Sequence, residues 1–133
     1  MPSIAMLSLV VRDYDEALAF YVDGLGFELV EDTVVPEQSK RWVVVRPPGM
    51  GQCALLLARA SNTEQVQRIG DQTGGRVFLF LYTDNFDRDY AGYKSKGVEF
   101  VRQPEDMPYG RVAVFRDLYG NQWDLLQPSG GLR

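Results

Sequence analysis

The run Leu9-Val10-Val11-Arg12-Asp13 decides how this sequence folds, because its pattern returns later in the chain. It ends a β-prone stretch, and Asp13 with a Glu three positions later predicts the first turn of a helix. At an offset of 71 positions, residues 80–84 read Phe-Leu-Tyr-Thr-Asp. The same offset joins Gly26, which ends the first predicted helix, to Gly97, which ends the second. We interpret this repeat as an internal duplication; a generic α+β chain with two similar helices is the alternative.

Outward from the two helices, the alternation of apolar and polar residues predicts the order βαβββ in each half. In the first half, strands are expected over residues 4–11, 27–33, 41–46 and 52–58. A helix begins at Asp13, with a polar loop at 36–40 and a turn at 47–51. In the second half, a helix runs from Asp84 to Gly97, and strands are expected over residues 77–82, 98–102, 111–116 and 122–127.

The chain is therefore expected to form a single domain made of two repeats. The first module spans residues 4–60 and the second spans residues 77–128. Between them, residues 61–76 are predicted to hold a short helix over residues 63–69, capped by Ser61 and Glu64, and then a glycine-containing linker.

Composition excludes several classes of protein. Of the 133 residues, 45% are hydrophobic and 24% charged, as in a globular protein, and a net charge of −4 argues against nucleic acid as a partner. The single cysteine, Cys53, excludes an internal disulfide framework and predicts a reducing, cytoplasmic location. The apolar run at Met6–Val11 is far shorter than the roughly 20 residues that cross a bilayer, and no basic signal region precedes it. We therefore expect no membrane partner.

The chain contains no histidine. This excludes nucleophile machinery that depends on imidazole, such as a Ser-His-Asp triad, and iron sites with two His ligands and one carboxylate. It also excludes the imidazole-bearing zinc sites, and a single cysteine excludes the thiolate-rich ones. Any chemistry must therefore use Asp, Glu, Tyr, Lys, Arg or an external cofactor.

Three stretches in this layout resemble the vicinal oxygen chelate superfamily, the group of glyoxalase I, bleomycin-resistance proteins and extradiol dioxygenases. They are Leu9-Val10-Val11-Arg12-Asp13, Ala19-Phe20-Tyr21 followed by Leu25-Gly26-Phe27, and Phe115-Arg116-Asp117-Leu118-Tyr119-Gly120-Asn121, with Leu118 where proline is usual. The resemblance covers residues 4–128. It implies an α+β fold in which two βαβββ modules form an open barrel-like cup, and a homodimer as the usual assembly.

The resemblance also implies positions for four metal ligands, normally His or Glu, on inward-facing strands. Here these positions correspond to Met6, one of the leucines at 55–57, Phe78 and Asp124. Three of the four are apolar, and a lone carboxylate cannot hold a divalent metal ion in a dry cup. We therefore predict that the chain uses no metal and no cofactor.

Asp124 is the polar residue that remains on the predicted inner face, because strand alternation puts it opposite Trp123 and Leu125. We interpret it as an anchor for a ligand amine or hydroxyl, or as a general base with a raised pKa. The alternative is a carboxylate hydrogen-bonded to a nearby Arg or Tyr, without a role in ligand binding.

Besides Asp124, the candidate ligand-binding residues are Met6, Trp42, Leu55, Leu57, Phe78, Phe80, Tyr109 and Arg111. The apolar members form a floor for an aromatic or extended ligand, or else they fill the cup as ordinary core. Trp42 is a stacking residue or packs in the core or a dimer interface. Tyr109 and Arg111 bind an anionic or planar group, or they form a solvated rim.

These residues favour a metal-independent small-molecule-binding protein that holds an apolar or aromatic ligand in the cup, as in drug sequestration by bleomycin-resistance proteins. The alternative is a metal-free lyase, isomerase or dioxygenase-like enzyme with Asp124 as general base and Tyr109, Tyr82 or Arg111 as its electrophilic partner. A third interpretation is an interaction module with a filled cup. The expected partners are the small molecule and a second copy of the chain.

Overall fold

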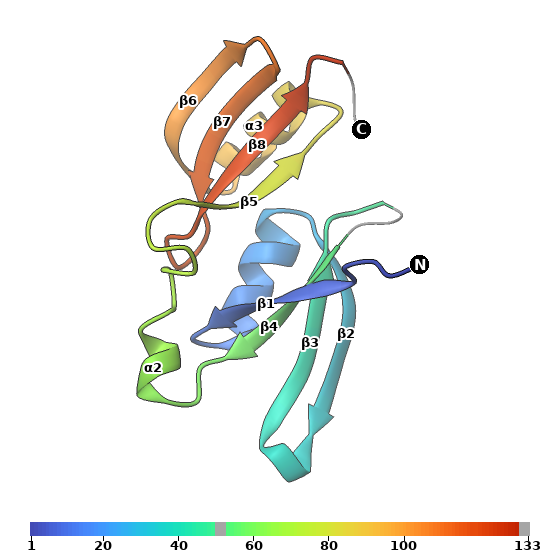
Figure 1. The fold of residues 1–133 in the computed structure, drawn as a ribbon, viewed down its shortest axis with the longest axis vertical. Helices are drawn as coiled ribbons and strands as arrows, with labels where there is room; N and C mark the ends of the chain where they lie inside the picture. The colour runs from blue at the N-terminus through green and yellow to red at the C-terminus, as the bar shows by residue number, and fades with distance from the viewer. Residues whose placement is uncertain (50–52, 131–133) are drawn as a thin grey trace. The chain divides into compact units, whose positions relative to one another are not determined.

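The computed structural model describes residues 1–49 and 53–130 of the chain (Figure 1). Contacts within the chain divide it into two units, with the boundary between Ile69 and Gly70. Within these residues, each unit contains one four-stranded sheet. The predicted turn at 47–51 and the start of the predicted strand at 52–58 fall partly outside the described residues.

The first unit has the predicted order of elements. Its strands are β1 (Met6–Val11), β2 (Glu28–Val35), β3 (Lys40–Arg46) and β4 (Ala54–Arg59). Its helical segments are α1 (Tyr14–Leu18), a π-helix (Ala19–Gly24), a 3-10 turn (Pro36–Gln38) and α2 (Thr63–Val66). The strands lie in the order β1-β4-β3-β2, with β1 parallel to β4 and the other neighbours antiparallel.

The second unit repeats this arrangement. Its elements are β5 (Val77–Tyr82), α3 (Phe86–Ser95), β6 (Glu99–Met107), β7 (Gly110–Arg116) and β8 (Gln122–Pro128). The strands lie in the order β5-β8-β7-β6, and again only the first pair is parallel. The fold class expected from the sequence, α+β with two βαβββ modules, is therefore confirmed.

The core of the first unit lies on one face of its sheet. Leu9, Leu57 and Val43 lie side by side in the strand register and are fully buried. Ala17 of α1 and Tyr21 of the π-helix are also fully buried, and α1 contacts β4. Apolar residues at alternate strand positions build this face, and each fully buried leucine stabilises the unit by about 1.5–3 kcal/mol.

The core of the second unit is built from aromatic rings. Phe115 on β7 stacks on Trp123 of β8 with their ring centroids 5.7 Å apart, and it lies equally close to Phe100 of β6. Phe86 and Tyr90 of α3 stack at 5.7 Å, and Tyr90 meets Phe100 edge-on at 4.6 Å. This continuous set of rings packs α3 against one face of the sheet.

The helices of the first unit are shorter than predicted. Asp13 is the N-cap of α1, as expected, and accepts a hydrogen bond from the Glu16 backbone N–H at 2.9 Å. A π-helix then replaces the second half of the predicted helix. The N-cap of α2 is Asn62 rather than Ser61, because the Asn62 side chain accepts the hydrogen bond from the Gln65 N–H at 2.9 Å.

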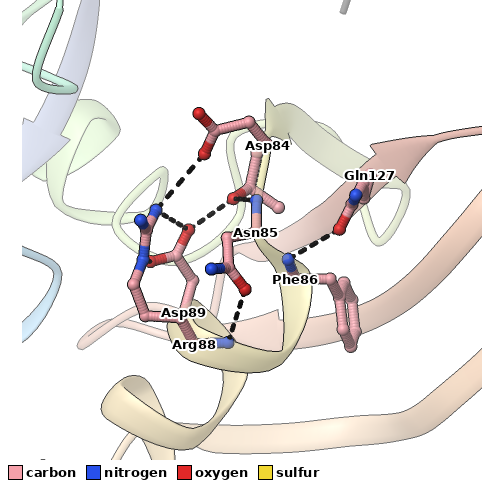
Figure 2. Close-up of polar contacts among 7 residues, drawn as sticks. Asp84, Asn85, Phe86, Arg88, Asp89 and Gln127 are labelled. Atoms are coloured by element: carbon pink, nitrogen blue, oxygen red, sulfur yellow. Dashed lines mark hydrogen bonds and ion pairs between the residues drawn. The ribbon is translucent and has the colours of Figure 1, made fainter. Parts of the chain in front are cut away.

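The start of α3 also differs by one residue from the prediction. Asn85, not Asp84, is the N-cap, and its side chain accepts a hydrogen bond from the Arg88 N–H (Figure 2). The Thr83 hydroxyl accepts the Asn85 N–H at 2.9 Å, which turns the chain before the helix begins. The Asp84 carboxylate pairs instead with the Arg88 guanidinium at 3.4 Å.

Candidate functional site

Asp124 lies in the middle of β8, between two neighbouring strands. Its partners in the register are Phe80 on β5 and Val114 on β7. The residues before and after it, Trp123 and Leu125, are buried at 2% and 0% exposure in the aromatic core. Asp124 therefore lies on the sheet face opposite that core. The Asp124 face includes Phe80, Tyr82, Arg102, Val112, Val114, Asp124 and Leu126.

A shallow hollow of about 50 Å³ lies beside Asp124, with Arg102, Glu105, Met107 and Tyr109 in its lining. A cavity of this size holds a few water molecules or one polar group of a ligand. The hollow can therefore receive a functional group, while the rest of a ligand must lie over the surrounding face.

The charges around this hollow compensate the Asp124 carboxylate only in part. Among residues 1–49 and 53–130, no hydrogen bond or ion pair involves the Asp124 carboxylate. Arg102 pairs with Glu105 at 3.7 Å, so its charge is partly neutralised. Burial raises the pKa of Asp124, and the charge of Arg102 opposes this increase. A cationic or hydroxyl group of a ligand would supply the hydrogen bond that the carboxylate lacks.

Aromatic side chains are exposed around the carboxylate. Phe80 is 63% exposed, Tyr82 is 49% exposed, and Tyr109 is 55% exposed. Phe80 and Tyr82 share the Asp124 face, and Tyr109 lines the hollow. Rings of this kind offer large flat surfaces for stacking. Three of the predicted ligand-binding residues, Phe80, Tyr109 and Asp124, thus lie in one region of the second unit.

The predicted residues of the first unit divide between the two faces of its sheet. Met6 is 39% exposed, and strand alternation places it on one face with Leu56 and the half-buried Trp42. Leu55 and Leu57 lie on the other face, in the core, at 3% and 0% exposure. Leu56, rather than Leu55 and Leu57, is thus the β4 leucine that shares a face with Met6.

Phe78 and Arg111 lie outside the Asp124 face. The Phe78 ring meets Trp123 edge-on at 6.5 Å, next to a shift in register that follows Val77. The Arg111 guanidinium lies 5.2 Å from the ring centre of Phe86, in α3, and pairs with Asp106 at 2.9 Å. Arg111 precedes Val112 of the Asp124 face by one position, and so alternation directs it to the α3 side.

Most of the residues that line the hollow are not among the predicted site residues, and they include Arg102, Glu105 and Met107. The sequence predicts a strand that ends at Arg102, whereas β6 continues to Met107. Two shifts in register, between Phe100 and Arg102 and between Arg102 and Glu105, carry the strand past Pro104. The polar composition of this stretch is typical of a loop, and so the sequence has no signal for the extension.

The donor groups at the four positions implied by the resemblance do not fit a metal ion. They are the thioether of Met6, a leucine of β4, the phenyl ring of Phe78 and the carboxylate of Asp124. Within the described part of the chain, no group of three or more His, Cys, Asp or Glu side chains could hold a metal ion. In the same residues, no helix is long and apolar enough to cross a membrane.

The chain is similar in sequence to a known protein family and to an individual protein. Residues 3–125 match the family model described as Glyoxalase/Bleomycin resistance protein/Dioxygenase superfamily. An uncharacterized protein of Shewanella frigidimarina is 62% identical over 125 residues, which cover 94% of this chain and 93% of that protein.

Two crystal structures resemble the chain in fold and sequence. The structure of TnmS3, an antibiotic binding protein from Streptomyces sp. CB03234, is 32% identical, with a TM-score of 0.77 and coverage of 97% of this chain and 98% of that one. A superfamily member from Sphaerobacter thermophilus is 31% identical, with a TM-score of 0.71 and coverage of 96% and 98%.

Proposed function

Because the chain belongs to the Glyoxalase/Bleomycin resistance protein/Dioxygenase superfamily, we propose that it is a small-molecule-binding protein that holds an apolar or aromatic ligand without a metal ion. The observation that carries this proposal is the unpaired carboxylate of Asp124 beside the exposed ring of Phe80. The similarity to TnmS3, an antibiotic binding protein, supports binding of a small molecule.

The proposed ligand has a flat apolar part and a cationic or hydroxyl group. The flat part lies over Phe80, Tyr82 and Tyr109, and the polar group enters the hollow and donates to Asp124. A hydrogen bond to a charged group contributes about 1.5–3 kcal/mol. The net charge of −4 favours the approach of a cation, although only as a long-range effect. Sequestration of a cationic antibiotic by a homodimer in the cytoplasm is the proposed biological form of this activity.

The first experiment measures metal content and ligand binding on the same purified protein. Mass spectrometry of the metals should find less than one equivalent of zinc, nickel, iron or manganese per chain. Titration with proflavine, a flat aromatic cation, and with metal-free bleomycin should show saturable binding and a rise in the melting temperature with ligand concentration. Stoichiometric metal, together with binding that chelators abolish, would overturn the metal-free proposal.

The role of Asp124 is tested by Asp124→Asn, which keeps the shape of the side chain and removes its charge. Its affinity for proflavine should fall by about tenfold, as expected from the loss of one charge-assisted hydrogen bond. Glu37→Gln removes the same charge from an exposed position on the other unit and should leave the affinity unchanged. Equal losses of proflavine affinity in both variants would show that the effect arises from the net charge of the protein, and they would exclude Asp124 as the anchor.

A metal-free enzyme is the second candidate, favoured by the raised pKa of Asp124 and by Tyr109 in the same hollow. A carboxylate with a raised pKa is suited to act as a general base. If Asp124→Asn retained ligand affinity and abolished the conversion of a bound compound, the enzyme would replace the binding protein as the proposed function.

A further inference from the structure

The first unit contains a cavity of its own, which lies where two of its strands separate. Among the described residues, β3 and β4 pair from Val43 to Val45 and from Leu55 to Leu57 and not beyond. Beyond this point, β3 continues to Lys40 beside β2, and β4 continues to Arg59 beside β1. Figure 1 shows the hairpin of β2 and β3 extending past the end of β4. A pocket of about 400 Å³, the fork pocket, lies here and is lined by residues of the first unit.

Where the strands separate, side chains form hydrogen bonds with backbone groups that the two strands no longer pair with each other. The hydroxyl of Tyr14, from α1, accepts a hydrogen bond from the Arg41 backbone N–H at 3.3 Å. The Arg59 guanidinium donates to the Ser39 carbonyl at 3.1 Å. Tyr14 is only 4% exposed, so its ring is held in place. The fork is therefore a supported feature of the unit rather than a frayed strand end.

The fork pocket is positively charged although the whole protein is negative. Its lining includes Lys40, Arg41 and Arg59 and, among the residues that the structure describes, contains no Asp or Glu. Arg41 is neutralised by Asp32 at 2.7 Å and by Asp15 at 3.0 Å. Its hydrogen bond to Asp32 holds the pKa of that carboxyl below its ordinary value.

Lys40 and Arg59 have no such compensation. Within residues 1–49 and 53–130, no carboxylate lies within ion-pair distance of either side chain. The Arg59 guanidinium uses one donor on the Ser39 carbonyl, and its remaining donors are available. With three cations at the pocket and the two carboxylates that pair with Arg41, the net charge there is 3 − 2 = +1, which would attract an anion.

The same pocket has apolar and aromatic walls. Trp42 from β3 and Leu56 from β4 line it on one side. The Tyr14 ring lies beneath both guanidinium groups, 5.1 Å from that of Arg41 and 5.2 Å from that of Arg59. The volume lies in the range of about 300–1,000 Å³ that is usual for small-molecule sites. Apolar walls with a few convergent charges are the usual composition of such sites.

We propose that the fork pocket binds a small aromatic carboxylate. Its carboxylate pairs with Arg59 and Lys40, and its ring lies against Trp42 and Leu56. The residues of this site belong to the first unit, whereas Asp124 belongs to the second, and the site selects a ligand of the opposite charge. A planar anion matches the arrangement because arginine binds a carboxylate through two parallel N–H groups and lysine adds a point charge.

The test follows the two indole N–H signals of the protein by nuclear magnetic resonance during titration with 4-hydroxybenzoate. The Trp42 signal should shift in a saturable way, and the Trp123 signal should stay in place because that ring is buried in the other unit. 4-Hydroxybenzamide, which is neutral and has nearly the same shape, should bind at least about tenfold more weakly. Equal shifts with the amide, or no shift of Trp42, would overturn the proposal.

Two variants identify the cations responsible. Lys40→Gln changes an exposed side chain and should weaken 4-hydroxybenzoate binding by about three- to tenfold without loss of folding. Arg59→Gln should weaken it by about tenfold or more. Arg46→Gln, on the same strand as Lys40 but paired with Glu28 outside the pocket, is the matched control and should leave the affinity unchanged. Equal losses for Arg46→Gln and Lys40→Gln would contradict a specific site.

Further titrations separate binding in the fork pocket from a general attraction of anions. Raising the ionic strength from about 0.01 to about 0.15 M shortens the screening length from about 30 to about 8 Å, and it should weaken binding of the carboxylate but not of the amide. If inorganic phosphate shifted the Trp42 signal as strongly as 4-hydroxybenzoate does, the aromatic ring of the ligand would have no role in binding. Asp124→Asn should leave 4-hydroxybenzoate binding intact, and Lys40→Gln should leave proflavine binding intact.

Discussion

Phe80 and Asp124 lie side by side on adjacent parallel strands, with an exposed aromatic ring next to a half-buried carboxylate. Burial disfavours the ionised form of the carboxylate, and the pKa of Asp124 is raised accordingly. A bound cation or hydroxyl group would relieve this cost. The pair therefore links the stability of the second unit to the proposed binding of a ligand.

Replacement of Asp124 by asparagine should stabilise the protein at neutral pH. The folded state holds the Asp124 proton more tightly than the unfolded chain does, so this stabilising contribution is lost as the pH rises from the ordinary value of 3.8 through the raised pKa. The asparagine side chain cannot ionise and avoids this loss. Thermal unfolding should show a higher melting temperature for Asp124→Asn at pH 7, with a difference that vanishes toward pH 3. A variant that is less stable than the parent at pH 7 would contradict the desolvation of Asp124.

Two phenylalanines of the second unit differ in burial, because one lies in the core and the other on the surface. Phe86 is 1% exposed and stacks on Tyr90, so Phe86→Ala should cost about 3–5 kcal/mol of unfolding free energy. Phe80 is 63% exposed, so Phe80→Ala should cost at most about 1 kcal/mol. The same Phe80→Ala variant should weaken proflavine binding. Urea unfolding and fluorescence titration measure the two effects, and equal losses of stability would show that Phe80 belongs to the core.

Asp117 organises the turn between β7 and β8. One of its carboxylate oxygens accepts the backbone N–H groups of Tyr119, Gly120 and Asn121 at 2.9–3.1 Å. The other accepts the Asn121 side-chain amide at 2.9 Å and the Trp123 indole N–H at 3.4 Å. Asp117→Ala leaves these donors without their acceptor and should cost about 3 kcal/mol or more in urea unfolding.

Asp117→Asn is a milder substitution at the same position. Its single acceptor oxygen can serve only one of the two sets of donors, and its NH₂ group then faces the other set. Its loss of stability should therefore lie between those of the parent and Asp117→Ala. If both variants retained the stability of the parent, the turn would not depend on the carboxylate.

Two glycines with similar backbone angles differ in their surroundings. Gly70 has φ +77° and Gly97 has φ +86°, which is the left-handed region that disfavours other residues. A Cβ at Gly70 would overlap the Tyr119 carbonyl oxygen, whereas a Cβ at Gly97 would meet open space. Gly97→Ala should cost about 1–2 kcal/mol, and Gly70→Ala should cost about 1–3 kcal/mol more. Urea unfolding compares them, and equal costs would contradict the close contact at Gly70.

Local signals were sufficient for the order of the elements. The predicted strand at 77–82 has the same bounds as β5, and Asp13 caps α1 as expected, because alternation, caps and glycine stops act within a few residues. The shift of the α3 cap from Asp84 to Asn85 required a hydrogen bond from the Asn85 N–H to Thr83, a choice between adjacent polar residues that spacing does not decide.

The sequence by itself determined the α+β class, the two βαβββ halves and the position of Asp124 opposite Trp123 and Leu125. Only the tertiary structure decided which residues share a face or a pocket. Leu56 lies on the face of Met6 because of the register between β1 and β4, and Arg111 turns to Phe86 because α3 packs on that side. The fork pocket joins residues of β3 and β4 with residues of α1 and α2. Pairing and packing between segments far apart in the chain select these neighbours, and no local pattern of residues encodes them.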